Sequence, residues 1–224
     1  MSTSLPDSAA LAWHATSWLR GNGSTDELTS RFGLDLDQLA ALRRSGSDGL
    51  GLALPRPGDP LGLGGPAALT AAAMDAGEAA VGRGVALVPH RQGSAGWWEQ
   101  HDAEPRQVPD LGEADRALRA EVLGAADTLA RLDVAHWQPA LADEFLDLAR
   151  PAELLGPAGI PAPAVALAGR ALRALRIAEL GLADDGGATT APEITARQQV
   201  LVGLDRTARR ALVAACSPEA WPPG

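Results

Sequence analysis

The clearest pattern in this chain is a helical spacing of apolar residues that occurs twice after residue 110. In the first stretch, five apolar residues follow one another at intervals of four, three, four and three: Leu118, Val122, Ala125, Leu129 and Leu132. The last stretch begins near Pro192 and carries a second stripe: Ile194, Leu201, Leu204, Ala208, Ala211 and Ala215. Such spacing places apolar side chains on one face of an α-helix. With two further apolar stretches at 139–149 and 164–182, the second half is predicted to be helical.

The first half alternates between predicted helices and short apolar runs. Helices are expected over 8–20 and after the cap Ser24, with Gly33 as a candidate break before the helix resumes over 36–44, and an Ala-rich helix is expected over 67–81. The runs 50–54 and 85–89 are predicted to be buried strands. A turn at residues 92–94 is expected to return the second of these strands into a third, which passes through Trp97 and Trp98.

These elements predict an α+β fold with two portions. Residues 1–110 are expected to form a small two- or three-stranded sheet with helices, and residues 111–217 a mostly α-helical half of about four helices. Residues 218–224, which are rich in proline, are expected to be a loose tail. The sequence leaves open whether the two portions form one continuous domain.

Charge and composition limit the partners and the cellular location that the sequence predicts. The net charge is −9, which disfavours general binding to nucleic acid or to an anionic membrane. The first seven residues lack the basic start and apolar core of a signal peptide, and the uncharged stretches are too short to span a bilayer. Cys216 is the only cysteine, so no intrachain disulfide is expected. Together these features predict a cytoplasmic location.

The basic residues are all arginine, 19 in number, and tyrosine is absent. This usage is typical of GC-rich codons. The strings LALPRPGDPLGLGGPAALTAAAMDAGEAAVGRGVALVP and LGEADRALRAEVLGAADTLARLDVAHW resemble segments of uncharacterised proteins from high-GC actinobacteria. The resemblance implies a source and no chemistry.

A Gly/Pro-rich loop at 56–66, between the first strand and the Ala-rich helix, is a candidate anion site. Backbone amides at the start of a helix bind phosphate or carboxylate groups. The candidate ligand-binding residues are Arg56, Gly58, Gly62, Gly64, Gly65, Arg83 and His90. However, the glycine spacing fits neither a Walker A loop nor a dinucleotide fingerprint, and three prolines remove amide donors. The alternative is a rigid connection between strand and helix.

Other chemistry is weakly represented. The four histidines are too scattered for a metal site, although His90 and His101 would meet if the hairpin forms. Asp143 and Asp147 are expected to share a solvated helix face. Cys216 has no nearby histidine, and no G-x-S-x-G motif occurs. We therefore predict no catalytic residues, no metal and no cofactor.

The adjacent pair Trp97–Trp98 is the feature that points toward a partner. On a strand, the two rings face opposite sides, so one is expected in the core and the other at an interface. This pair supports the leading hypothesis, a non-enzymatic adaptor or regulatory protein that binds a protein partner or itself.

Two alternatives remain open. One is a binder of, or an enzyme acting on, a small anionic ligand at loop 56–66. The other is nucleic-acid contact through arginines of the last two helices: Arg170, Arg173, Arg206 and Arg210. Pairing of these arginines with acidic helices inside the molecule is the competing interpretation, and the net charge favours it.

Overall fold

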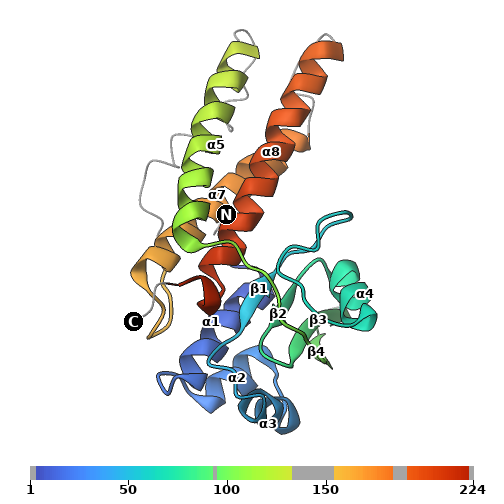
Figure 1. The fold of residues 1–224 in the computed structure, drawn as a ribbon, viewed down its shortest axis with the longest axis vertical. Coiled ribbons are helices and arrows are strands. Elements are labelled where there is room, and N and C mark those ends of the chain that lie inside the picture. Colours follow the sequence, from blue (N-terminus) through green and yellow to red (C-terminus); the bar gives the residue numbers. More distant parts are fainter. Residues whose placement is uncertain (1–3, 93–94, 133–153, 184–190, 222–224) are drawn as a thin grey trace.

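The computed structural model describes residues 4–92, 95–132, 154–183 and 191–221. The elements follow in the order α1 (Asp7–Leu19), α2 (Thr25–Phe32), α3 (Leu36–Arg44), β1 (Gly51–Ala53), α4 (Ala67–Ala76), β2 (Ala79–Val81), β3 (Ala86–Gln92), β4 (Ala95–His101), α5 (Leu111–Leu132), α7 (Ala162–Leu182), α8 (Ala191–Ala215) and the 3₁₀ turn η1 (Pro218–Ala220). The helix predicted at 139–149 lies outside the described residues. The α+β class is confirmed (Figure 1).

The sheet has four strands in the order β1-β2-β3-β4, and each neighbouring pair is antiparallel. The prediction of two or three strands is therefore wrong. Its error lies in residues 79–81, which the Ala-rich pattern assigned to the preceding helix. Gly77 ends α4 with a left-handed backbone (φ 77°), and the chain then turns back to pair β2 with β1. Glycine adopts this conformation without a steric penalty, which makes it the usual residue just past a helix end.

The hairpin predicted around residues 92–94 is confirmed, since β3 pairs with β4 over seven residue pairs. Trp97 lies opposite His90, and Trp98 lies opposite Pro89. Neighbouring residues on a strand face opposite sides of the sheet. Accordingly Trp98 is 7% exposed, whereas Trp97 is 50% exposed. As expected, one of the two tryptophans lies in the core and the other lies on the surface.

The two faces of the sheet are covered by different helices. On one face, Leu87 and Trp98 pack with apolar residues of α1, α2 and α3. On the other, Val81 and Val88 pack with Leu69 and Ala73 of α4. Both faces bury apolar side chains, so the short strands are held by packing as well as by their few hydrogen bonds.

The long helices α5, α7 and α8 form a bundle that extends away from the sheet (Figure 1). Helix α8 contacts both α5 and α7, and its C-terminal end reaches β1, where the Leu52 N–H donates to the Cys216 carbonyl. Trp13 of α1 belongs to the apolar cluster of this bundle. One apolar cluster therefore contains residues of both the bundle and the sheet portion. No helix among the described residues is long and apolar enough to cross a membrane.

After α8, the structure describes the chain as far as residue 221. Pro218–Ala220 forms a 3₁₀ turn, and the buried Trp221 donates its Nε1–H to the Ala215 carbonyl at 3.1 Å. Residues 218–221 are therefore not the loose tail that the sequence predicted. Proline composition indicated the end of a helix correctly but gave no sign that the next tryptophan packs back onto it.

Candidate functional site

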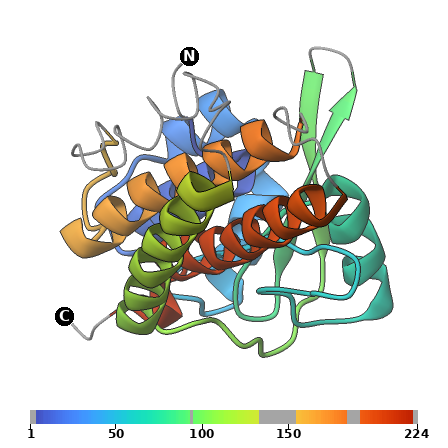
Figure 2. The ribbon, with the colours of Figure 1, turned by 90° about the horizontal axis from the view of Figure 1, so that it is seen from above.

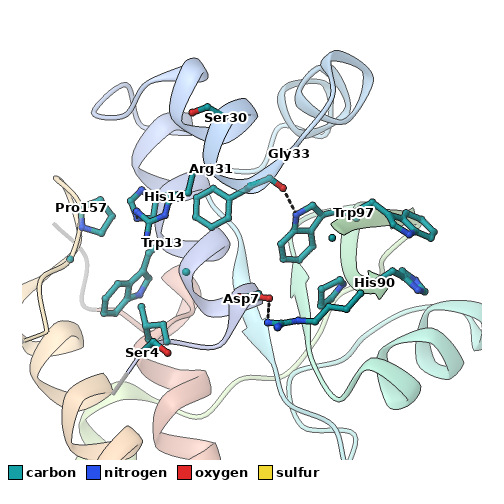
Figure 3. A pocket seen from close by; sticks show the side chains of 18 of the residues that line it. Ser4, Asp7, Trp13, His14, Ser30, Arg31, Gly33, His90, Trp97 and Pro157 are labelled. Carbon is teal, nitrogen blue, oxygen red and sulfur yellow. Dashed lines mark hydrogen bonds and ion pairs between the residues drawn. The ribbon is translucent and has the colours of Figure 1, made fainter. Parts of the chain in front are cut away.

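A groove of about 1060 Å³ opens between the N-terminal helices and the β3–β4 hairpin (Figure 3). Its lining comes from the start and middle of α1, the end of α2, both hairpin strands and the loop segment 154–157. In the view from above, the hairpin projects beside α4 at one side of the molecule (Figure 2). The groove thus joins segments that are far apart in the sequence.

The hairpin wall carries an aromatic platform. The half-exposed Trp97 ring stacks on the His90 ring, with centroids 4.4 Å apart and planes 12° from parallel. Nε2 of His90 lies 2.7 Å from Oε2 of Glu99, and Nε2 of His101 lies 3.5 Å from the same oxygen. The hairpin does bring His90 and His101 to one place, and the carboxylate they share is Glu99. This contact fixes the imidazole of His90 against the indole.

The opposite wall places a histidine between an acid and an arginine. Nδ1 of His14 lies 2.9 Å from Oε1 of Glu27, and Nη1 of Arg31 lies 3.1 Å from Nε2 of the same ring. A guanidinium only donates hydrogen bonds, so Nε2 of His14 accepts from Arg31. The Arg31 guanidinium also lies 5.2 Å from the centre of the Phe32 ring. These contacts orient both the His14 and the Arg31 side chains in the groove.

Three contacts tie the two walls together. Arg91 of β3 forms an ion pair with Asp7 of α1 (Figure 3). Trp98 donates its Nε1–H to the Phe32 carbonyl at 2.8 Å, and Gln38 donates to the Trp98 carbonyl at 2.7 Å. These contacts hold the two walls of the groove in a fixed arrangement.

Glu78, just before β2, supports the start of α1. Its carboxylate accepts the backbone N–H of Ser8 at 2.8 Å. Burial raises the pKa of Glu78, and the Ser8 hydrogen bonds oppose that shift without cancelling it. The Asp7 charge raises this pKa further, whereas the Arg91 charge lowers it. The folded protein therefore holds the Glu78 proton more tightly than the unfolded chain does.

A pH-dependent stability difference is expected from E78Q. A carboxyl group whose pKa is raised on folding costs stability as the pH rises from its unfolded pKa through its folded pKa. Glutamine keeps an acceptor for Ser8 and removes this cost. We expect the free energy of unfolding of E78Q, relative to that of wild type, to increase from pH 4 to pH 7. Urea unfolding at both pH values measures this difference. E104Q, in an exposed loop, is the control for loss of one negative charge. A difference that stays constant with pH would contradict the expectation.

The Gly/Pro-rich loop lies apart from the groove lining. Some of its amides are engaged within the loop: Arg56 N–H donates to Asp59, Asp59 N–H donates to Arg56, and Leu63 N–H donates to Pro60. Buried arginines hold it from outside. Nη1 of Arg106 donates to the carbonyls of Leu52 and Gly62, and Arg209 binds the Leu54 carbonyl and the Asp59 carboxylate.

Of the residues predicted for an anion site, only His90 lines the groove. Arg83 lies in the turn between β2 and β3, where its N–H donates to Ser47. Gly64 is packed so closely that a Cβ there would lie 2.7 Å from the Pro105 carbonyl oxygen. The anion site at residues 56–66 stays a prediction, and the groove that His90 lines contains none of the described residues of that loop.

The other candidates from the sequence are the metal ligands, Cys216 and the arginines of the last two helices. Among the described residues, no three His, Cys, Asp or Glu side chains are placed to hold a metal ion. Cys216 is buried, and burial raises the pKa of its thiol, so it is a poor nucleophile. Arg170 forms an ion pair with Asp115 of α5, in line with intramolecular charge pairing. Asp143 and Asp147 lie outside the described residues.

Two family models match consecutive parts of the chain. Residues 8–111 match the N-terminal domain of the Rv1486c-like proteins, and residues 112–213 match their C-terminal domain. The chain belongs to the Rv1486c-like family. No curated protein and no solved structure matches it. The family descriptions name no activity, substrate or partner for Rv1486c-like proteins.

Several residues in and beside the groove were not predicted from the sequence. His14, Glu27 and Arg31 meet because α1 and α2 pack side by side, and the sequence contains only the Glu27–Arg31 spacing of four residues as a hint. Asp7 and Arg91 are 84 positions apart. Contacts of this kind depend on the sheet and its covering helices, which sequence patterns do not specify.

Proposed function

We propose that this protein binds a segment of a partner protein in the groove, with Trp97 as the central contact, and so acts as an adaptor or regulator without chemistry of its own. The observation that carries the proposal is the half-exposed Trp97, stacked on His90 at the wall of the groove. Tryptophans in such positions are frequent hot spots of protein interfaces.

The apolar surface extends across the groove. Leu155, in the loop segment opposite the hairpin, is 90% exposed and lines the same groove. Phe32 and Pro157 add further apolar lining. A volume of about 1060 Å³ lies at the upper end of the range for small-molecule pockets. An extended peptide with two apolar side chains matches this layout, because each side chain can reach one end.

The proposal predicts that W97A loses peptide binding. A phage-displayed library of random peptides is panned against the wild-type protein, and the selected peptides are synthesised and titrated by fluorescence. We expect W97A to weaken their binding by at least about tenfold, as for a hot-spot tryptophan. The control is L123A, which removes an exposed apolar side chain of α5 outside the groove lining and is expected to leave binding unchanged.

Two results would contradict the proposal. One is that panning enriches no peptide whose binding depends on Trp97. The other is a small molecule that remains bound when the protein is analysed by native mass spectrometry and that W97A releases. The second result would identify the groove as a small-ligand site. A dimer that W97A dissociates is a different outcome, and it would identify the partner as a second copy of this chain.

A further inference from the structure

We infer that the bound segment is acidic: it places a carboxylate between Arg31 and Arg91 while an apolar side chain packs on Trp97. This inference rests on the proposed function and adds the chemical class of the partner. It is drawn from the charges that line the groove, the hydrogen-bond donors they keep, and the aromatic faces that are already covered.

Among the described residues, the groove lining has more arginines than acids, although the chain as a whole is acidic. It contains Arg31 and Arg91 but one acid, Asp7, while the chain has a net charge of −9. Glu27 and Glu99 do not line the groove, and each contacts a histidine. Arginines in a cleft attract an anionic ligand.

Both arginines keep donors for a ligand. The Asp7 ion pair uses Nη2 of Arg91, and the contacts of Arg31 with His14 and Glu27 use its Nη1. Each guanidinium has five N–H groups, so further donors remain on both side chains, which are exposed. Arginine binds carboxylates through paired N–H groups, and such charge-assisted hydrogen bonds are stronger than neutral ones.

A cationic segment fits the groove less well, although aromatic residues often bind cations. The Phe32 ring already has the Arg31 guanidinium over it, and one face of Trp97 is covered by His90. A lysine or arginine of a partner would therefore lie near the arginines of the groove, which repel it. A carboxylate in the same position would accept hydrogen bonds from those arginines.

The test uses the peptides selected against wild-type protein, each compared with a version in which every Glu and Asp is replaced by Gln or Asn. We expect the selected peptides to be acidic, and R31Q and R91Q each to weaken binding of the acidic version by about tenfold. The same substitutions are expected to change binding of the neutral version by less than about twofold. R119Q, an exposed arginine of α5, is the matched control. Thermal unfolding of each variant shows whether the fold is retained.

The outcomes separate the two proposals. Acidic peptides that lose affinity in R31Q and R91Q support the inference. Peptides that depend on Trp97 but are neutral or basic, with equal affinities for the arginine variants, overturn it and leave the proposed function standing. If R91Q reduces binding of both versions equally, then Arg91 only holds the groove through Asp7, and the inference is overturned as well. Absence of any peptide that depends on Trp97 overturns the proposed function itself.

Discussion

W13A is expected to lower the free energy of unfolding by about 3–5 kcal/mol, the range for removing a buried Trp or Phe side chain. Trp13 lies on α1, in the sheet portion of the chain, yet it is buried in the apolar cluster of α5, α7 and α8. Its Nε1–H donates to the Ala215 carbonyl at 3.3 Å, a contact between residues 202 positions apart. The substitution leaves a large cavity and removes a donor from a buried carbonyl.

Chemical denaturation followed by circular dichroism measures this effect. The matched control is W97A, which removes the same side chain from a half-exposed position and is expected to cost less than about 1 kcal/mol. W13F separates the hydrogen bond from most of the packing and is expected to lie between wild type and W13A. Similar losses in W13A and W97A would show that Trp13 does not join the two portions as described.

G51A is expected to destabilise the protein by at least about 3 kcal/mol, although it adds a single methyl group. A Cβ at Gly51 would lie 1.8 Å from Nη2 of Arg106 and 2.7 Å from the Ser217 hydroxyl oxygen. Arg106 is nearly buried and cannot simply move, because it donates to the carbonyls of Leu52 and Gly62 and forms an ion pair with Glu219. Burial lowers the pKa of Arg106, and Glu219 acts in the opposite direction. Displacing this side chain would leave buried carbonyls without donors.

A second glycine provides the control for G51A. Gly124 lies within α5, and a Cβ there has no neighbour within 4 Å. G124A is expected to stabilise the protein by about 0.5–1 kcal/mol, because alanine favours the helix. Both variants are compared by thermal unfolding and by urea titration. A small effect of G51A would mean that Arg106 has another position available at low cost.

These two sites explain how the portions of the chain are joined. Trp13 reaches from α1 into the helical bundle, and Arg106 fastens β1 to the segment after α8 through Ser217 and Glu219. The groove depends on the same framework, since Trp13 also lines it. Substitutions of Trp13 or Arg106 are therefore expected to alter the groove as well as the stability of the protein.

Periodicity alone predicted much of the fold. Helices α5 and α8 follow from stripes such as Leu118 to Leu129, because a buried helix face requires apolar residues every three or four positions, and α7 follows from a continuous apolar stretch. The hairpin follows from two apolar runs around a turn, and the alternation of strand side chains predicted that Trp97 and Trp98 would differ in exposure. Strand β2 was missed because three apolar residues after an Ala-rich helix have no period of their own.

The sequence by itself thus determined the long helices, the hairpin, the acidic charge and the exposed tryptophan, since each depends on residues close together in the chain. The tertiary structure alone decided the groove, because its walls come from α1, α2, the hairpin and residues 154–157. It also decided the roles of His14, Arg31 and Asp7, which only the packing of those elements brings into contact with Glu27 and Arg91. Local patterns specify which face of an element is buried, whereas the choice of neighbour depends on contacts between distant residues.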